Sequence, residues 1–233
     1  MKKVLGNRKL VIGVFGVGII LLTLVALVPL ALSLISGGGV TTEDVDSNHA
    51  KAAEGELDGQ WDVVKGNPRN FTSVGFTFNE VLPAEKRATS GSTTKVTGTG
   101  TVEGGMLNQA SISVDMTTLT TDKEVRDHNM KSKLFETQKY PHATFELTKP
   151  VDLSALPTDG TMGTVELTGT LTIKDKAQTI TQSFNALRDG TGIVIGGKLP
   201  INREDYDVIT PDFIAAQIAE EGTIDLRLSF EHQ

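Results

Sequence analysis

Apolar and polar residues alternate with a period of two through most of the chain after residue 58, and this pattern limits the fold more than any other feature. It is clearest over residues 164–173, where four threonines and a glutamate form the polar face. The apolar face of this stretch consists of Val165, Leu167, Gly169, Leu171 and Ile173. Because successive side chains of a strand point to opposite sides, the alternation predicts antiparallel strands with one buried face and one solvated face.

Turn residues divide the alternating stretches into short strands. A Gly-Gly pair at 104–105, a Lys-Asp-Lys run at 174–176 and an Asp-Gly pair at 189–190 are typical of tight connections. Strands of this length and spacing predict a sandwich or a barrel. The Thr- and Gly-rich segment 91–105 keeps the alternation, so we expect a strand whose small inward residues leave interior space.

Two segments depart from the period of two. Residues 121–138 are mostly polar with scattered apolar positions, which predicts helical turns and loop. Thr210, Pro211 and Asp212 provide an N-cap and a proline at the first helical position, so we expect a short helix over 213–219.

An uncharged apolar run occupies residues 10–35. As a helix it spans about 39 Å, more than the roughly 30 Å of a bilayer's hydrocarbon core. Basic residues precede it and acidic residues follow it, so the positive-inside bias predicts a cytoplasmic N-terminus over 1–9 and a transmembrane signal-anchor helix over 10–35. The remainder is then extracytoplasmic, in a single-pass protein of the cell membrane. A cleaved signal peptide, with a weak site at 31–33, is the alternative, but its apolar core is usually about 7 to 15 residues long.

Residues 36–57 begin with three glycines and continue with small and polar residues that leave almost nothing to bury. We therefore expect a flexible linker over 36–57. The folded domain is expected over 58–233.

The charge balance excludes some partners. Without the four basic charges of the N-terminus, the chain carries 18 Lys and Arg against 29 Asp and Glu, a net charge of −11. This argues against nucleic acid as a partner and against electrostatic docking on anionic lipid headgroups. The chain has no Cys, which excludes disulfides, thiolate chemistry and an acylated lipoprotein cysteine.

No residue pattern points to catalysis. The four histidines, His128 and His142 among them, lack the spacing of metal ligands. No serine elbow, Walker loop or dinucleotide fingerprint is present in the sequence. We therefore expect no catalytic residue, no metal site and no cofactor, and a protein that is not an enzyme.

Charged, aromatic and turn residues crowd together over 126–145. The characteristic positions are Arg126, Asp127, Met130, Ser132, Phe135, Tyr140, Pro141 and Phe145. Their order resembles the central signature of the YceI-like family. Further motifs that resemble this family follow in the expected order, at 61–62, 73–76, 167–173, 201–206 and 221–224. The resemblance therefore covers about residues 58–233.

The resemblance implies a lipocalin-like antiparallel β-barrel of about eight strands with short helical segments, which binds a polyisoprenoid lipid outside the cytoplasm. The chain departs from the family pattern in the first strand, where histidines often stand in place of Phe71-Thr72 and of a residue near Asn79-Glu80. It departs again at Asp207, where the family often has Gly.

The inward strand faces and two residues of the irregular segment are the predicted lipid contacts. They are Val74, Phe76, Phe78, Ile112, Val114, Met116, Met130, Phe135, Phe145, Leu147, Val165, Leu167, Leu171, Ile195 and Leu226. Arg126, Asp127 and Arg203 are candidates for the barrel rim. Two interpretations of Arg126-Asp127 stay open: an ion pair that pins the irregular segment, which we favour, and a polar contact to a ligand headgroup.

The leading hypothesis is a membrane-tethered lipid-binding protein of the cell envelope. It would hold an isoprenoid quinone or a prenyl lipid in an apolar barrel, for carriage or storage. The alternative is an exported, non-enzymatic interaction or scaffold domain with a solid core, acting in envelope stress or surface contact. Cavity volume discriminates between the two, because alternation predicts a dry face without saying whether side chains or ligand fill it. The sequence leaves open whether the protein forms a homodimer.

Overall fold

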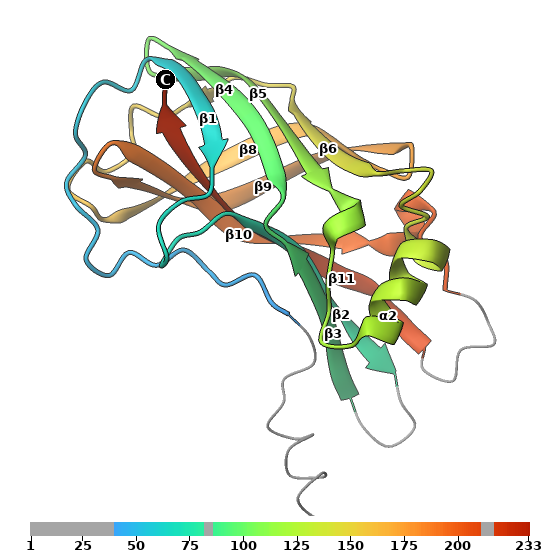
Figure 1. Ribbon diagram of the computed structural model, residues 1–233. Coiled ribbons are helices and arrows are strands. Elements are labelled where there is room, and N and C mark those ends of the chain that lie inside the picture. The colour runs from blue at the N-terminus through green and yellow to red at the C-terminus, as the bar shows by residue number, and fades with distance from the viewer. Residues whose placement is uncertain (1–39, 82–85, 211–216) are drawn as a thin grey trace, which may run out of the picture. The chain divides into compact units, whose positions relative to one another are not determined.

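A computed structural model describes residues 40–81, 86–210 and 217–233, drawn in colour in Figure 1. The predicted cytoplasmic N-terminus and the predicted transmembrane helix over 10–35 lie outside the described residues. Within the described ranges, no helix is both long and apolar enough to cross a membrane.

The described chain forms one antiparallel sheet of eleven strands. They are β1 (Gly59–Val64), β2 (Ser73–Val81), β3 (Lys86–Thr93), β4 (Val96–Glu103), β5 (Met106–Asp115), β6 (His142–Leu147), β7 (Val151–Asp152), β8 (Met162–Ile173), β9 (Lys176–Asp189), β10 (Gly192–Asn202) and β11 (Gln217–His232). Short helices accompany them: η1 (Met116–Thr118), α2 (Glu124–Asn129), η2 (Met130–Leu134) and η3 (Arg203–Tyr206).

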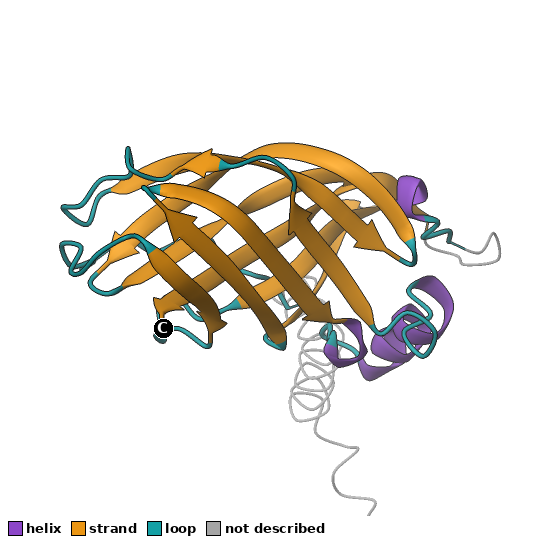
Figure 2. Ribbon diagram, turned by 90° about the horizontal axis from the view of Figure 1, so that it is seen from above, coloured by secondary structure: helices purple, strands orange, loops and turns teal. Residues whose placement is uncertain are grey.

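Eight of these strands close into a ring, in the order β1, β4, β5, β6, β8, β9, β10 and β11. The closing pair joins β1 to the last residues of β11, from Trp61↔His232 to Val64↔Ser229. The hairpin of β2 and β3 continues along the same edge, because β2 pairs with the earlier part of β11. The predicted all-β antiparallel barrel of about eight strands is confirmed. Figure 2 shows the strands wrapped around the interior and the helices gathered at one end.

All three predicted tight connections are hairpins. Gly104 and Gly105 join β4 to β5, with φ values of 61° and 75°. Lys174 and Asp175 join β8 to β9 with φ values of 50° and 60°, the two left-handed residues of a type I′ turn. The third hairpin, from β9 to β10, turns at Gly190.

The alternation places the apolar side chains inside the barrel. In β8, Val165 and Leu171 are buried, whereas Glu166 is exposed. The glycine of this stretch has a packing role, because a Cβ at Gly169 would lie 2.3 Å from the ring of Phe145 on the neighbouring β6. The missing side chain therefore makes room for an aromatic ring in the barrel interior.

The irregular segments agree with the sequence in one case and differ in the other. Residues 121–138 contain α2 and η2, as predicted. Of the helix predicted over 213–219, residues 213–216 lie outside the described residues, and 217–219 belong to β11. This part of the prediction is wrong because the backbone there pairs with β2, where Ile218 is opposite Glu80. Tertiary pairing therefore overrides the local helix-start signal.

The described part of the predicted linker, residues 40–57, lies against the outer wall of the barrel instead of being free of it (Figure 1, blue). Val45 is buried against Leu187 and Val194. The Asn70 side chain accepts from the Asp46 N–H at 2.9 Å and donates to the Asp46 carbonyl at 2.8 Å. The contacts of this segment are scattered and depend on residues distant in the chain, so composition alone predicted a linker.

Candidate ligand-binding cavity

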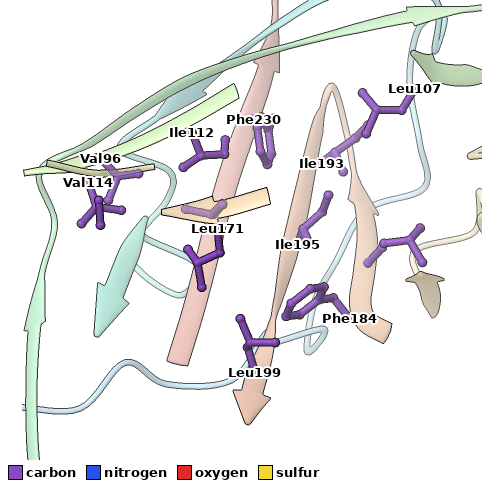
Figure 3. Close-up of a cluster of buried hydrophobic side chains, with 14 of the residues drawn as sticks. Val96, Leu107, Ile112, Val114, Leu171, Phe184, Ile193, Ile195, Leu199 and Phe230 are labelled. Carbon is purple, nitrogen blue, oxygen red and sulfur yellow. The ribbon is translucent and has the colours of Figure 1, made fainter. Parts of the chain in front are cut away.

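The barrel encloses a cavity of about 560 Å³, lined almost entirely by apolar side chains. Ile112 of β5, Leu171 of β8 and Ile195 of β10 surround this shared interior, as Figure 3 shows. Close-packed protein interiors contain few voids larger than a water molecule, whereas small-molecule sites are typically about 300 to 1,000 Å³. The interior of this barrel is therefore large enough to hold a ligand.

The structure brings the predicted lipid contacts together with one exception. Those that line the cavity are Val74, Phe76, Phe78, Ile112, Val114, Met116, Met130, Phe135, Phe145, Leu147, Leu167, Leu171, Ile195 and Leu226. Val165 does not line it, although its side chain is buried in the core. Val165 pairs with Phe184 of β9, and the larger Phe184 side chain reaches the cavity at this position.

The cavity is also lined by apolar residues outside the predicted set of lipid contacts. Among them are Trp61, Leu107, Leu134, Ile173, Phe184, Ile193, Leu199 and Phe230. Four of them lie in alternating stretches, and the period of two predicts their inward direction: Ile173, Ile193, Leu199 and Phe230. Trp61 lies outside any clean alternation; its indole N–H donates to the Leu57 carbonyl at 2.9 Å, and its ring meets His232 edge-on at 5.2 Å.

The cavity runs lengthwise through the barrel. The register of β11 shifts between Ile218 and Gly222. Beyond the shift, Gly222 is opposite the lining residue Phe78 and His232 is opposite the lining residue Trp61, so Phe78 and Trp61 are 10 positions apart along that strand. At about 3.3 Å per residue this is about 33 Å along the strand. A typical strand tilt of about 40° reduces it to about 25 Å along the barrel axis.

The helical end of the barrel carries the opening, which we call the mouth and define by the lining residues Glu80, Lys123, Val125, Arg126 and Asn129. Val125 of α2 lines the cavity and is also 75% exposed, so the cavity reaches the surface beside α2.

An aromatic contact holds the helical segment at the mouth. Phe135, which follows η2, packs against Phe76 of β2 with ring centroids 5.8 Å apart. Phe76 in turn lies 6.2 Å from Phe78, and Met130 of η2 is 3% exposed. The helical segment therefore contributes apolar side chains to the interior.

Arg126 and Asp127, which were predicted as rim residues, contact different partners. Arg126 contacts the Glu80 carboxylate at 3.6 Å and also pairs with Asp122. Asp127 accepts from the N–H and the hydroxyl of Thr121, both at 2.6 Å, and does not line the cavity. An ion pair between Arg126 and Asp127 is not among the contacts of the described residues. Arg126 reaches Glu80 of β2, whereas the contacts with Asp122 and Thr121 lie within the segment 121–138.

Arg203, the third predicted rim residue, lines the cavity and is 7% exposed. Its guanidinium donates to the carbonyls of Val208, Ala219 and Ile218, at 2.6, 3.2 and 3.4 Å. It thereby joins η3 to β11. Asp207, which stands where the resembling family often has Gly, ends η3 with a φ of 57°, so the left-handed turn is kept without a glycine.

Tyr206 of η3 is the titratable group most affected by the cavity wall. It is 2% exposed, and burial raises the pKa of its phenol to about 12. No group of three His, Asp or Glu side chains in the described residues converges on a metal-sized site.

Comparisons with known proteins give the same architecture. The profile of a family described as YceI-like domain matches residues 61–230. A polyisoprenoid binding domain from Saccharophagus degradans, implicated in plant cell wall breakdown, has a TM-score of 0.60 at 19% identity, over 74% of this chain and 98% of that chain. BcnA from Burkholderia cenocepacia has a TM-score of 0.55 at 23% identity, over 68% and 95%. At these identities the likeness shows the fold. A comparison with curated proteins gave no match.

Proposed function

The chain belongs to the YceI-like domain family, and from this membership we propose that it is a lipid-binding protein whose barrel holds a polyisoprenoid-type lipid, either an isoprenoid quinone or a prenyl lipid. The observation that carries the proposal is the apolar cavity of about 560 Å³ inside the closed barrel. The Saccharophagus degradans domain of the same fold, described as polyisoprenoid binding, supports this choice of ligand class.

The chemistry of the cavity suits such a ligand. A prenyl tail offers many apolar carbons, and burial contributes roughly 0.8 kcal/mol for each CH₂. This driving force is non-directional, so an apolar lining provides affinity without any reacting group. We accordingly propose carriage or storage of the lipid, without catalysis.

The alternative of a scaffold domain requires a solid core. A close-packed interior would leave few voids larger than a water molecule. The volume of the cavity counts against that alternative.

The proposal includes a membrane tether: residues 10–35 anchor the chain and the barrel is extracytoplasmic. Its support is the uncharged apolar run and the flanking charges of the sequence. Protease treatment of intact cells tests the exposure of the barrel, and fractionation of untreated cells tests the anchor. We expect the protease to digest the barrel, and the untreated protein to stay in the membrane fraction. A barrel protected from the protease, or a protein released from the membrane, contradicts the proposal.

The ligand is tested by purifying the full-length protein from its native membrane, extracting it with organic solvent and identifying the extract by mass spectrometry. A co-purified prenyl lipid in about one-to-one ratio is the expected result. Repeated preparations that contain no isoprenoid, and that take up none when it is added, would refute the proposal.

A further inference from the structure

Tyr206 is a buried phenol in the wall of the apolar cavity. It is the last residue of η3, lines the cavity and is 2% exposed. Burial, and less strongly the charge of Asp205, raises the pKa of its phenol, and no hydrogen bond contributes to this shift. A buried hydroxyl without a partner costs free energy, and the hydroxyl of a buried tyrosine usually has one. The position of this hydroxyl therefore requires an explanation beyond packing.

The Tyr206 hydroxyl has no hydrogen-bond partner among the described residues. In the same part of the chain, Nη2 of Arg227 is the polar side-chain atom that is fully enclosed and lacks a partner. The Tyr206 oxygen lacks a partner as well but is not fully enclosed, and the cavity that its side chain lines accounts for the surface that it keeps. The hydroxyl can therefore bond to a molecule inside the cavity.

The surrounding hydrogen bonds hold η3, and with it the phenol, in place. Nζ of Lys174 donates to the Asp207 carbonyl at 2.9 Å, and the Gln178 side chain donates to the Asp205 carbonyl at 3.2 Å. Arg203, at the start of η3, donates to three backbone carbonyls. A ligand that bonds to the phenol thus meets a preorganised group, which reduces the entropic cost of binding.

We infer that the Tyr206 hydroxyl is the hydrogen-bond contact for an oxygen atom at the polar end of the bound isoprenoid, either the carbonyl of a quinone or the hydroxyl of a prenol. Since η3 follows β10 at the helical end of the barrel (Figure 2), the polar end lies toward the mouth and the tail points toward Trp61. The inference rests on the proposed function and deepens it, because it assigns a directional contact that the apolar lining does not provide.

The test removes one oxygen atom from the protein. Tyr206→Phe keeps the ring and deletes the hydroxyl. Tyr140→Phe is the matched control, because Tyr140 is the other of the two tyrosines of the chain and does not line the cavity. Three probes that share a geranylgeranyl tail are titrated into the full-length, delipidated protein in nanodiscs: a geranylgeranyl benzoquinone, geranylgeraniol and the matching hydrocarbon without oxygen. Partition of each probe into the nanodisc lipid is the same for every variant.

We expect Tyr206→Phe to weaken binding of the quinone, the prenol or both by about three- to tenfold, the factor that a single hydrogen bond typically contributes. The hydrocarbon should bind to this variant at least as tightly as to the unmodified protein. Tyr140→Phe should leave all three affinities unchanged. The probe whose binding weakens identifies the polar group as a quinone carbonyl or a prenol hydroxyl.

The stability of the delipidated protein distinguishes this role from a structural one. Because the hydroxyl then has no partner to lose, Tyr206→Phe should not lower the melting temperature. A lower melting temperature means that the hydroxyl is bonded within the protein, and it overturns the inference. So does unchanged binding of both oxygen-bearing probes, or an equal loss for the hydrocarbon or in Tyr140→Phe. These outcomes leave the proposed function intact, whereas failure of all three probes to bind the unmodified protein overturns both.

Discussion

Phe135 packs against Phe76 with ring centroids 5.8 Å apart, and this contact joins the helical segment to the barrel wall at the mouth of the cavity. The two residues come from elements that are far apart in sequence, the end of η2 and the middle of β2. We therefore expect the stability of this aromatic contact to control access to the interior.

Phe135→Ala is expected to accelerate release of bound lipid several-fold, because it removes the aromatic contact that holds the helical segment. Because Phe135 is only partly buried, we expect a loss of about 2 kcal/mol in the free energy of unfolding. Ligand exchange into acceptor vesicles measures the first effect and urea titration the second. Lys133→Ala, which truncates an exposed residue of the same segment that does not line the cavity, is the control. An unchanged release rate in Phe135→Ala would contradict the role of the contact.

Larger side chains at two inward positions test whether the interior is a cavity or a solid core. Leu226→Phe enlarges a residue that lines the cavity, so we expect less bound lipid and a stability change under about 1 kcal/mol. Val165→Phe enlarges a buried residue that does not line it, and overpacking should cost about 1 to 3 kcal/mol. Thermal unfolding and lipid content measure both. Equal destabilisation by the two substitutions would mean that the interior is filled by side chains.

Trp61 is the single tryptophan of the chain and lines the end of the cavity away from the mouth. We expect a long-chain prenol to change its fluorescence emission, because the end of the tail then contacts the indole. A short-chain prenol with the same headgroup should bind without this change. If short and long prenols alter the emission equally, the ligand does not lie along the barrel axis from Glu80 to Trp61.

The Arg227 guanidinium holds the segment 40–46 on the outer wall. It donates to the carbonyls of Phe71 and Asp44, each at 3.1 Å, and lies 4.5 Å above the Phe71 ring. Burial lowers the pKa of this guanidinium, and no described residue accepts from its Nη2. Arg227→Ala should therefore cost about 2 to 4 kcal/mol and expose 40–46 to proteases.

Arg227→Met keeps the buried stem and removes the partly unsatisfied charge, so we expect a smaller loss of stability than for the alanine variant. Limited proteolysis with sequencing of the released fragments reports on the segment. If 40–46 is cut as slowly in Arg227→Ala as in the unmodified protein, other contacts hold it in place.

Three of the aspartates are expected to contribute to the acid sensitivity of the fold. Asp115, Asp152 and Asp159 each accept hydrogen bonds from the residue two positions later. The bond from its hydroxyl has the larger effect and the bond from its N–H the smaller, and both lower the pKa of the carboxyl. A lowered folded-state pKa stabilises the fold above the unfolded value of about 3.9, and the stabilisation is lost as the pH falls through the folded value.

Stability is thus expected to decline below about pH 4, and the triple Asp→Asn variant should flatten this decline. Urea unfolding at a series of pH values measures it. If the free energy of unfolding falls equally steeply with decreasing pH in the variant, other carboxylates cause the decline.

Much of the cavity was predictable from the sequence because a strand has an exact period of two. Once Phe76, Ile112 and Leu171 were assigned to strands, their inward direction followed. The failure at Val165 has a physical cause: the alternation predicts a buried face, but the size of the neighbouring Phe184 decides which buried side chain meets the cavity.

The mouth was less predictable. The sequence drew attention to Arg126 and Asp127, but it could not assign their partners, because Glu80 is 46 positions away from Arg126 and comes near only through the closure of the barrel. Glu80 itself interrupts an apolar row, and composition gives such a residue no role. Its contacts at the mouth depend on Thr89 and Arg126 being brought to the same place.

The sequence by itself determined the strands, their buried faces and the tight hairpins, because periodicity and turn residues act over a few neighbouring positions. Tertiary structure alone decided that the barrel closes through β1 and β11, that residues 40–57 lie on its wall, and that its interior is hollow. These outcomes depend on contacts between residues distant in the chain and on the volumes of side chains that meet there. A local pattern contains neither.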